Sequence, residues 1–373
     1  MMRGGLEGVV AATTSLSDVD GERGELIIAG FPVGELAAQA TFEETTWLLW
    51  HGDLPSGRQL ESFRAGLAAQ RALPPATLSL LRECARAGIH PMDALRIALG
   101  TVSLSSDEAS AIVACCPTII AAFWRLFRGD EPLSPRPDLG HAANFLYMLS
   151  GDAPDPERLR ALETYLNTVI DHGLNASTFT CRVITSTGSD LVSAVVGAAG
   201  ALKGPLHGGA PGPALDMVFE IGEASRAEVI LRRKIEAGEK LMGFGHRIYR
   251  VRDPRADVLS AAAERLYTRA GDMSLYTLAR SVEATAIRLL EEYKPGRRLQ
   301  TNVEFYTALL LHGLGLDVPL FTPTFALSRV SGWIAHAFEQ RRANRIIRPQ
   351  SEYIGRRDRR WLPIAERLQT VVS

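Results

Sequence analysis

The sequence predicts an all-α protein, and three observations carry this prediction. Helix start and stop signals recur along most of the 373 residues. Strand signals gather in one stretch near the N-terminus, and no strand–helix alternation of the kind that builds a parallel sheet is present. Hydrophobic residues make up 46% of the chain, enough to fill a sizeable core over a length that allows two domains. We find no internal repeat and no low-complexity linker, so composition alone does not place a domain boundary.

The strand signal lies in residues 14–30. Two pairs in this stretch, Asp20-Gly21 and Arg23-Gly24, favour a tight turn between apolar positions. We therefore expect a small β-hairpin ahead of the first helix.

Capping residues mark helices in the first half of the chain. Thr41 and Glu44 form a capping box, and Gly52 supplies the stop for that helix. Asp155 followed by Pro156 gives a cap and a proline at the first helical position, ahead of an apolar stripe with helical spacing.

Further signals follow the same logic. Residues 225–228 predict a second capping box, and the Asp-Pro pair at 253–254 and the Thr-Pro pair at 322–323 repeat the cap-then-proline pattern. Pro117 lies inside the apolar stretch 109–127, where a ring without an N–H predicts a kink or a break.

Charge and cysteine content exclude several classes of protein. The 41 basic and 42 acidic residues leave a formal net charge of -1, so the chain is not built to coat nucleic acid. The four cysteines show neither a CxxC pair nor metal-ligand spacing, which predicts buried free thiols in a reducing compartment and no metal. The N-terminus lacks the apolar region of a signal peptide, and no uninterrupted apolar run approaches 18 residues. We therefore expect a cytoplasmic protein with no membrane partner.

Two segments carry a histidine where packing would prefer apolar groups. His172 falls at the end of a predicted helix, where exposed carbonyls favour a donor, although a helix-ending His before an Asn/Ser/Thr cap would look the same. His207 lies in the glycine-rich stretch 202–212, which lets a ligand approach the backbone closely but also fits a plain connection.

Two more segments carry charge. Residues 239–256 combine His246, flanked by glycine, with four arginines, which suits an anionic ligand but also a solvated basic turn. In residues 301–306, Asn302 is a predicted N-cap that places Glu304 in the first helical turn. The helix dipole there favours an ionised carboxylate, which is useful in a base, yet an acid in the first turn is also common decoration.

Near the C-terminus an arginine stands in an aromatic stripe. Phe325, Arg329 and Trp333 follow one another at helical spacing, and burial of Arg329 costs several kcal/mol unless an anion meets it, on the order of magnitude known for buried ions. The arginines that crowd the following stretch fit solvated or interface charges.

These segments together resemble citrate synthases, in particular the shorter bacterial and archaeal kind. The motifs HGLNASTFT, GPLHGGAP, MGFGHRIY, NVEFY, FALSR and IIRP occur in order and at family-like separations, over roughly residues 6–355. The resemblance implies a citrate synthase fold of two helical domains, with residues 1–207 and 316–373 in the large domain and residues 208–315 in the small one. It also implies an acyltransferase of the tricarboxylic acid cycle that acts as a homodimer on oxaloacetate and acetyl-CoA, with no tightly bound cofactor and no metal.

The resemblance assigns roles residue by residue. His207 matches the histidine that binds the acetyl-CoA carbonyl, His246 the one that polarises the oxaloacetate ketone, and Glu304 the position of the general base. Four positions match oxaloacetate-binding residues, the last of them contributed by the partner subunit: His172, Arg255, Arg329 and Arg348. The positions that match the CoA loop and a CoA-phosphate contact are Lys240, Leu241, Met242, Gly243, Phe244, Gly245 and Arg250.

One departure from the family pattern bears on the chemistry. The family usually reads Pro-Asn-Val-Asp where residues 301–304 read Thr-Asn-Val-Glu. The extra methylene of Glu304 moves the carboxylate by about 1.5 Å, and catalytic placement is sensitive at about the 1 Å level. Either the helix start shifts to compensate, or activity is reduced or redirected. Two alternatives therefore stand beside citrate synthase: a 2-methylcitrate synthase that uses propionyl-CoA, and a catalytically weak homologue that senses CoA or dicarboxylates.

Overall fold

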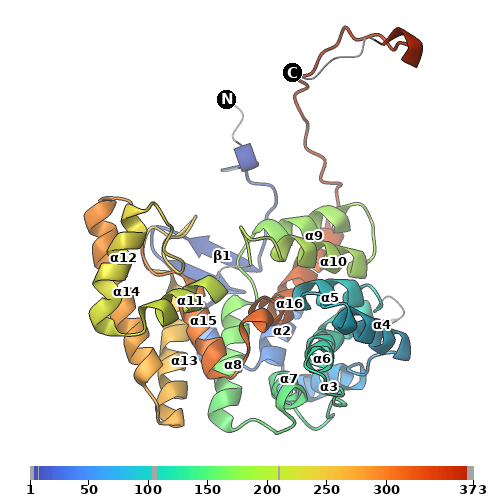
Figure 1. Ribbon diagram of the computed structural model, residues 1–373. Helices are drawn as coiled ribbons and strands as arrows, with labels where there is room; N and C mark the ends of the chain where they lie inside the picture. Colours follow the sequence, from blue (N-terminus) through green and yellow to red (C-terminus); the bar gives the residue numbers. More distant parts are fainter. Residues whose placement is uncertain (1–3, 7, 103–106, 209–210, 368–373) are drawn as a thin grey trace.

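The computed structural model describes residues 4–6, 8–102, 107–208 and 211–367, and helices dominate it (Figure 1). About 62% of the chain is helical and the one small sheet in the described ranges has three strands, which confirms the all-α prediction. In the first half the helices are α1 (Val33–Gln39), α2 (Phe42–His51), α3 (Gly57–Ala69), α4 (Pro75–Arg86), α5 (Pro91–Leu99), α6 (Glu108–Phe127), α7 (His141–Ser150) and α8 (Pro156–Val169). In the second half they are α9 (Ala176–Ser186), α10 (Leu191–Leu202), α11 (Pro211–Ile221), α12 (Ala227–Glu236), α13 (Pro254–Ala270), α14 (Ser274–Tyr293), α15 (Val303–Gly313) and α16 (Phe321–Arg342). Short 3-10 turns lie at Gly4–Leu6, Ala224–Arg226, Val318–Leu320 and Ile364–Glu366.

The predicted hairpin is present, and its turn contacts the loop at residues 248–250. Strands β1 (Ser17–Asp20) and β2 (Glu25–Ile28) pair antiparallel, and a two-residue strand β3 (Phe31–Pro32), too short to predict, extends the sheet. At the turn, a Cβ added to Gly21 would lie 2.3 Å from the carbonyl oxygen of Ile248, and the Gly21 carbonyl accepts from the Arg250 N–H at 2.8 Å. The hairpin is therefore pressed against the loop that carries His246.

Several predicted caps are confirmed by their hydrogen bonds. Thr41 and Glu44 exchange the two bonds of a capping box, and Gly52 ends the helix in the left-handed conformation, with φ of 93°. Asp155 accepts from two backbone N–H groups ahead of α8, with Pro156 at its first position. Asp253 caps α13 in the same way.

Two predicted starts are wrong, and of the kink or break predicted at Pro117 the break does not occur. Ser225 lies in a 3-10 turn where its hydroxyl faces Glu223, so α12 begins at Ala227 without a side-chain cap. Helix α16 begins at Phe321 directly after another 3-10 turn, and the Thr322 hydroxyl donates to the Gly208 carbonyl instead of capping. Both starts are built by a preceding turn, which local sequence signals do not reveal.

Helix α6 continues through Pro117 without a break. It packs against α4, α5, α7 and α16, and this burial offsets the hydrogen bond that proline removes. Within the described ranges, α6 is the one helix long and apolar enough to cross a membrane, but 72% of its most apolar window is buried in the protein. Its apolar surface faces the protein core.

The helices fall into two groups joined by long central elements. Helices α11 to α15 lie together at one side and α2 to α7 at the other, with α8 and α16 between them (Figure 1). The first group falls within residues 208–315, and the division of the chain into a large and a small domain stays a prediction.

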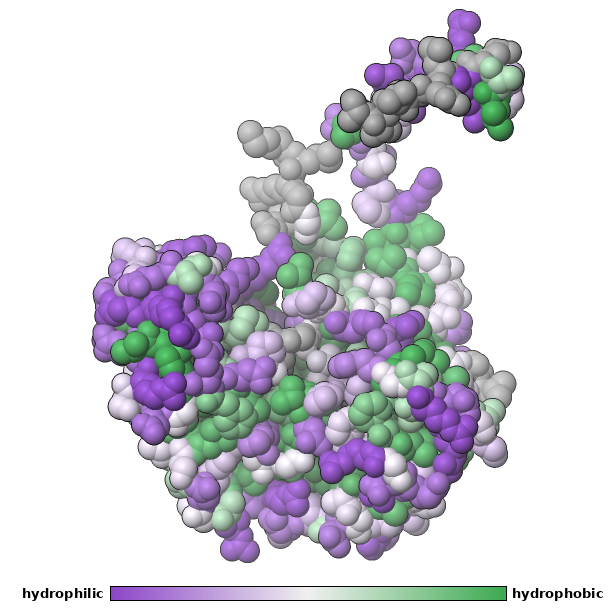
Figure 2. Space-filling model, viewed as in Figure 1, coloured by the Kyte–Doolittle hydropathy of each residue, from purple (hydrophilic) through white to green (hydrophobic). Residues whose placement is uncertain are grey.

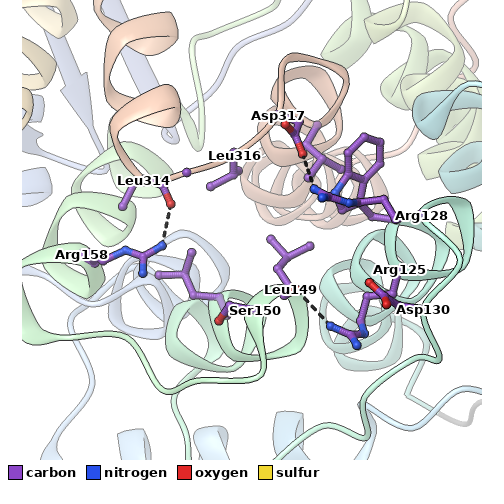
Figure 3. A pocket seen from close by; sticks show the side chains of 13 residues that line it. Arg125, Arg128, Asp130, Leu149, Ser150, Arg158, Leu314, Leu316 and Asp317 are labelled. Carbon is purple, nitrogen blue, oxygen red and sulfur yellow. Dashed lines mark hydrogen bonds and ion pairs between the residues drawn. The ribbon is translucent and has the colours of Figure 1, made fainter. Parts of the chain in front are cut away.

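A pocket of about 310 Å³ lies where α15 runs into α16 (Figure 3). Helices α6, α7 and α15 all end beside it, so three negative dipole ends converge there. Arg158 donates to the Leu314 carbonyl at 2.7 Å, Arg125 donates to the Leu149 carbonyl at 3.3 Å, and Arg128 pairs with Asp317. The guanidinium groups of Arg158 and Arg125 therefore bind carbonyl oxygens at helix ends, and that of Arg128 binds a carboxylate. None of the predicted site residues lines this pocket.

Candidate active site

His172 lies in the short segment between α8 and α9. Asn175 caps α9 by accepting from the Thr178 N–H at 3.1 Å, so the chain turns sharply and leaves His172 at the bend. The His172 ring is buried, its Nε2 lies 3.1 Å from the Tyr249 hydroxyl, and its centroid is 5.7 Å from that of His246. Burial, reinforced by nearby Arg255, lowers the pKa of His172 well below its usual value, so the ring is neutral.

His246 has a fixed tautomer. Its Nδ1 accepts from the backbone N–H groups of Ile248 and Tyr249, both at 3.1 Å. Because Nδ1 holds a lone pair, the proton of the neutral ring is on Nε2. Burial, and secondarily Arg255, lowers the pKa of His246 to about 4. The ring therefore presents an N–H donor suited to a ketone oxygen.

His207 follows α10 in a short turn and reaches α9. Its Nε2 lies 2.8 Å from the Ser177 hydroxyl and 3.4 Å from the Ser177 backbone nitrogen. That hydroxyl has one proton and two acceptors within reach, His207 Nε2 and Asn175 Oδ1 at 2.8 Å. The backbone N–H can only donate, which favours a lone pair on Nε2 and the proton on Nδ1. Burial lowers the pKa of His207 to about 4, so this ring too is neutral.

Glu304 stands in the first turn of α15, as predicted. Asn302 caps the helix by accepting from the Glu304 N–H at 3.0 Å. The helix dipole at this position favours ionisation, but burial acts against it. Burial raises the pKa of Glu304 to about 7; Arg255 acts in the opposite direction and does not offset it. The carboxyl is therefore poised between its two protonation states near neutral pH.

Two buried arginines supply positive charge. Arg255 makes a two-point ion pair with Asp253, at 3.0 and 2.8 Å, and Asp253 also accepts from the Val303 N–H at the start of α15. Arg329 donates to the Val169 carbonyl at 2.7 Å, and within the described residues no carboxylate lies within 4 Å of its nitrogens. Burial lowers the pKa of Arg329 to about 10. A buried guanidinium without a carboxylate partner calls for an anionic ligand.

The predicted CoA loop is fastened to the segment that carries Glu304. Asn302 donates from its backbone to the Gly243 carbonyl at 2.9 Å and from its side chain to the Gly245 carbonyl at 2.8 Å. Gly243 has φ of 86°, and a Cβ there would lie 2.9 Å from the Phe305 side chain. Within the loop Lys240 is exposed and the Leu241 side chain is buried, so only the backbone of Leu241 can face a ligand.

The structure brings most of the predicted residues together. His172 and His246 adjoin, Arg255 lies 3.5 Å from His246 Nε2, and the charges of Arg255 and Arg329 both act on Glu304. Arg348 is the exception. It is exposed on the segment that leaves the body after α16 (Figure 1).

Sequence reasoning missed the residues that orient this set. Ser177, Tyr249 and Asp253 hold His207, His172 and Arg255, respectively. Asp253 was predicted only as a helix cap, and Ser177 lay inside a stretch explained as capping. The signal that could have found them is a polar residue beside each predicted site residue, which is too common to be decisive.

Comparisons with known proteins agree on one family. The family model described as "Citrate synthase, C-terminal domain" matches residues 5–350. Citrate synthase 2 of Bacillus subtilis is 42% identical, over 97% of this chain and 98% of that protein. A 2-methylcitrate synthase of Mycobacterium tuberculosis is 40% identical, over 95% of this chain and 91% of that protein.

Solved structures give the same result. The crystal structure of citrate synthase from Pyrobaculum aerophilum has a TM-score of 0.90 and 40% identity, covering 97% of this chain and 95% of its own. The citrate synthase of Thermoplasma acidophilum, solved as a ternary complex with carboxymethyl coenzyme A and oxaloacetate, has a TM-score of 0.89 and 30% identity, covering 97% of this chain and 98% of its own.

Proposed function

This chain belongs to the citrate synthase family, and on that premise we propose that it joins the methyl carbon of acetyl-CoA to oxaloacetate and hydrolyses the resulting thioester to citrate and CoA. The observation that carries the proposal is the pair of neutral histidines, each with one ring nitrogen already bonded within the protein: His246 Nδ1 to two backbone N–H groups, and His207 Nε2 to the hydroxyl and the backbone N–H of Ser177. Each ring then has an N–H to offer at its other nitrogen. A condensation between two carbonyl compounds needs a donor for each carbonyl oxygen.

The first step is removal of a proton from the thioester methyl group. We assign it to Glu304, whose pKa of about 7 makes it a stronger base than an ordinary carboxylate while part of it is ionised at neutral pH. The His207 Nδ1–H donates to the thioester oxygen as it gains negative charge. Because that donor is in place before the reaction, little reorganisation is needed to stabilise the enolate.

The second step forms the carbon–carbon bond. The His246 Nε2–H polarises the ketone, the enolate carbon attacks it, and the ring proton passes to the new alkoxide oxygen; the ring regains a proton from the water that then attacks the thioester, and the proton held by Glu304 passes to the departing CoA sulfur. Arg255 and Arg329 hold the two carboxylates of oxaloacetate and select the face that is attacked. Water then cleaves the thioester, with the electron pair leaving on CoA sulfur. Within the described residues no cluster of three potential metal ligands occurs.

We further propose that the active unit is a homodimer in which Arg348 completes the partner's site. Arg348 is exposed, and the chain just before it is tied to the end of α9, where the Ile347 N–H donates to the Ser186 hydroxyl at 3.0 Å, so its side chain is available to a second copy. Apolar side chains gather over α9 and α10 near the base of the segment that follows α16 (Figure 2). Ile354 and Trp361 on the segment are 91% and 80% exposed, which fits a surface covered by a second copy.

A cytoplasmic location fits the cysteines. All four are free and buried, as predicted, and free thiols persist in reducing compartments.

A second candidate substrate is propionyl-CoA. Relatives named 2-methylcitrate synthase are as similar to this chain as several of those named citrate synthase, at 39–40% identity. The same residues would carry out that reaction, and the difference lies in the room beside the acyl methyl group.

The deciding experiment measures CoA thiol release with oxaloacetate and either acetyl-CoA or propionyl-CoA. It compares the wild type with Glu304→Asp and Glu304→Gln. We expect the wild type to prefer acetyl-CoA and the Gln variant to lose at least about 100-fold in kcat, because a general base contributes about 10²–10⁴-fold. Preference for propionyl-CoA would move the assignment to 2-methylcitrate synthase. A silent wild type with an active Asp variant would favour the sensing homologue.

A further inference from the structure

One face of α16 holds the segment on which His172 lies. Arg329, Trp333 and His336 follow at i, i+4 and i+7, so their side chains share that face. Arg329 donates to the Val169 carbonyl at 2.7 Å, and Trp333 Nε1 donates to the Ser177 hydroxyl at 3.1 Å. Between these two anchors, His336 Nε2 lies 3.1 Å from Asp171 Oδ1. Helix α16 therefore holds this segment through hydrogen bonds to residues before His172, next to it and after it.

The His336 ring is locked in one orientation. Arg182 Nη1 lies 3.1 Å from His336 Nδ1, and a guanidinium can only donate. Nδ1 therefore accepts, and the neutral ring donates its Nε2 proton to Asp171. The same guanidinium nitrogen also donates to Glu339 at 2.6 Å, which fixes Arg182 in turn. His336 and Asp171 are both fully buried, so a solvent-exposed alternative is not open to them.

Asp171 is the covalent neighbour of His172 and uses both of its oxygens. Oδ1 accepts from His336, and Oδ2 accepts from the Ser17 hydroxyl on β1. That hydroxyl accepts from the Gly173 N–H at 2.8 Å. The residues on both sides of His172 are thus tied to the same small network.

Close approach of α16 depends on a glycine. A Cβ added to Gly332 would lie 2.3 Å from the Ile170 carbonyl oxygen and 3.1 Å from Asp171 Oδ1. Any side chain at this position must push the Ile170–Asp171 backbone away from the helix.

We propose that His336 and Gly332 are positioning residues for His172. His336 acts through the Asp171 carboxylate and Gly332 through close contact with the backbone before it. Both are buried away from any substrate, and both determine where His172 stands relative to His246 and Arg255. The inference rests on the proposed function and on the match of His172 to an oxaloacetate-binding position of the family. Weakening the contacts of His336 and Gly332 with the segment before His172 therefore impairs oxaloacetate binding more than acetyl-CoA binding.

The test compares His336→Gln with His336→Leu in the full-length enzyme. A Gln amide can reproduce both bonds, with its oxygen accepting from Arg182 and its nitrogen donating to Asp171. Leu reproduces neither. We expect His336→Leu to raise the KM for oxaloacetate at least about 10-fold with the KM for acetyl-CoA within about twofold, while His336→Gln stays within about threefold of wild type, because displacements near 1 Å cost up to about 100-fold.

Gly332→Ala gives a second route that leaves the polar network intact. Its matched control is Gly66→Ala, at an exposed site of α3 where an added Cβ meets nothing within 4 Å. We expect Gly332→Ala to raise the KM for oxaloacetate and Gly66→Ala to leave it unchanged. If His336→Leu does not fold, the Gly332 pair decides.

Three results would overturn the positioning role. The first is an equal KM for oxaloacetate in His336→Gln and His336→Leu, and the second is an unchanged KM for oxaloacetate in Gly332→Ala. The third is a loss shared equally by both substrates, which indicates a general structural defect. Wild-type protein that releases no thiol contradicts the proposed function, not the positioning role. In that case oxaloacetate affinity from isothermal titration calorimetry reads out the same variants.

Discussion

At the scale of single residues, burial decides the protonation states in the site. Three histidines of the site have pKa values below the ordinary value of about 6.5, and in each case burial is the main cause: His172, His207 and His246. Glu304 moves in the opposite direction for the same reason, because a low dielectric disfavours the charged form of either group. The site therefore holds neutral donors beside a carboxyl that titrates near neutrality.

The raised pKa of Glu304 predicts the pH dependence of catalysis. A general base works only when ionised, so kcat/KM for acetyl-CoA should rise about tenfold per pH unit below 7 and level off above it. His207 and His246, with pKa values of about 4, stay neutral over this range and add no falling limb. Initial rates at subsaturating acetyl-CoA between pH 5.5 and 8.5 give the profile. A flat profile across pH 7 would mean that the catalytic base does not have a raised pKa, and loss of activity in Glu304→Gln would then decide whether Glu304 is that base.

His141 predicts a pH effect on stability. Its pKa is lowered to about 3, so between pH 3 and 6.5 the unfolded chain binds more protons at this residue than the folded chain does. The His141 contribution to the free energy of unfolding is complete above pH 6.5 and falls by up to about 1.4 kcal/mol for each pH unit below that. The ring stacks on Phe42, and neither nitrogen has a hydrogen-bond partner within the described residues.

His141→Phe keeps the stacking and removes the titration. Urea unfolding at pH 7.0, 6.0 and 5.0 should show the free energy of unfolding declining less steeply in the variant than in the wild type. Glu163 and Glu304, both with pKa values raised to about 7, act with the opposite sign in both proteins and cancel in the comparison. Parallel declines would mean that His141 does not carry the effect.

At the scale of elements, helix caps can be tested one by one. The Thr41 side chain accepts from the Glu44 N–H in a capping box at the start of α2. Thr41→Ala should lower the free energy of unfolding by about 1 kcal/mol, the usual cost of losing an N-cap. Urea denaturation at pH 7 measures the shift. A suitable control is Thr277→Ala, at an exposed threonine inside α14 that does not cap the helix.

Local signals predict an element when a side chain of that element makes the decisive contact. Asp155, Asn302 and Asp253 each accept from the helix that they start, and each start was predictable. Helices α12 and α16 start directly after a 3-10 turn without a side-chain cap, so the local sequence did not indicate these starts. Helix α6 stays continuous at Pro117 because it is buried on several sides.

The same distinction separates the residues of the candidate site that could be predicted from those that could not. Residues that a motif names could be predicted, because the motif preserves their type and spacing. Ser177, Asp171 and His336 could not, because their roles depend on contacts across the fold. His336 lies 165 positions from Asp171, and no local pattern connects them. The protonation of Glu304 depends on burial, which the sequence around it does not reveal.

At the scale of the whole molecule, the proposed dimer makes a prediction about mixed subunits. Arg348→Ala and Glu304→Gln should each be nearly inactive alone. If Arg348 serves the partner's site, a heterodimer of the two variants has one site with both Glu304 and Arg348 intact. Equal mixing after reversible dissociation should restore about a quarter of wild-type thiol release, because half of the dimers are mixed and each has one good site. No recovery, with mixing verified by mass spectrometry, would place Arg348 outside the partner's site.

Helix α6 has a consequence for how the protein is made. It leaves the ribosome as a 20-residue apolar segment, whereas α16, which packs against it, begins at Phe321. Translation at about 5–20 residues per second takes on the order of 10–40 s to cover the intervening chain. Helices α4, α5 and α7 are made before α6 or soon after it, so throughout that interval the part of α6 left uncovered is the face that α16 will occupy.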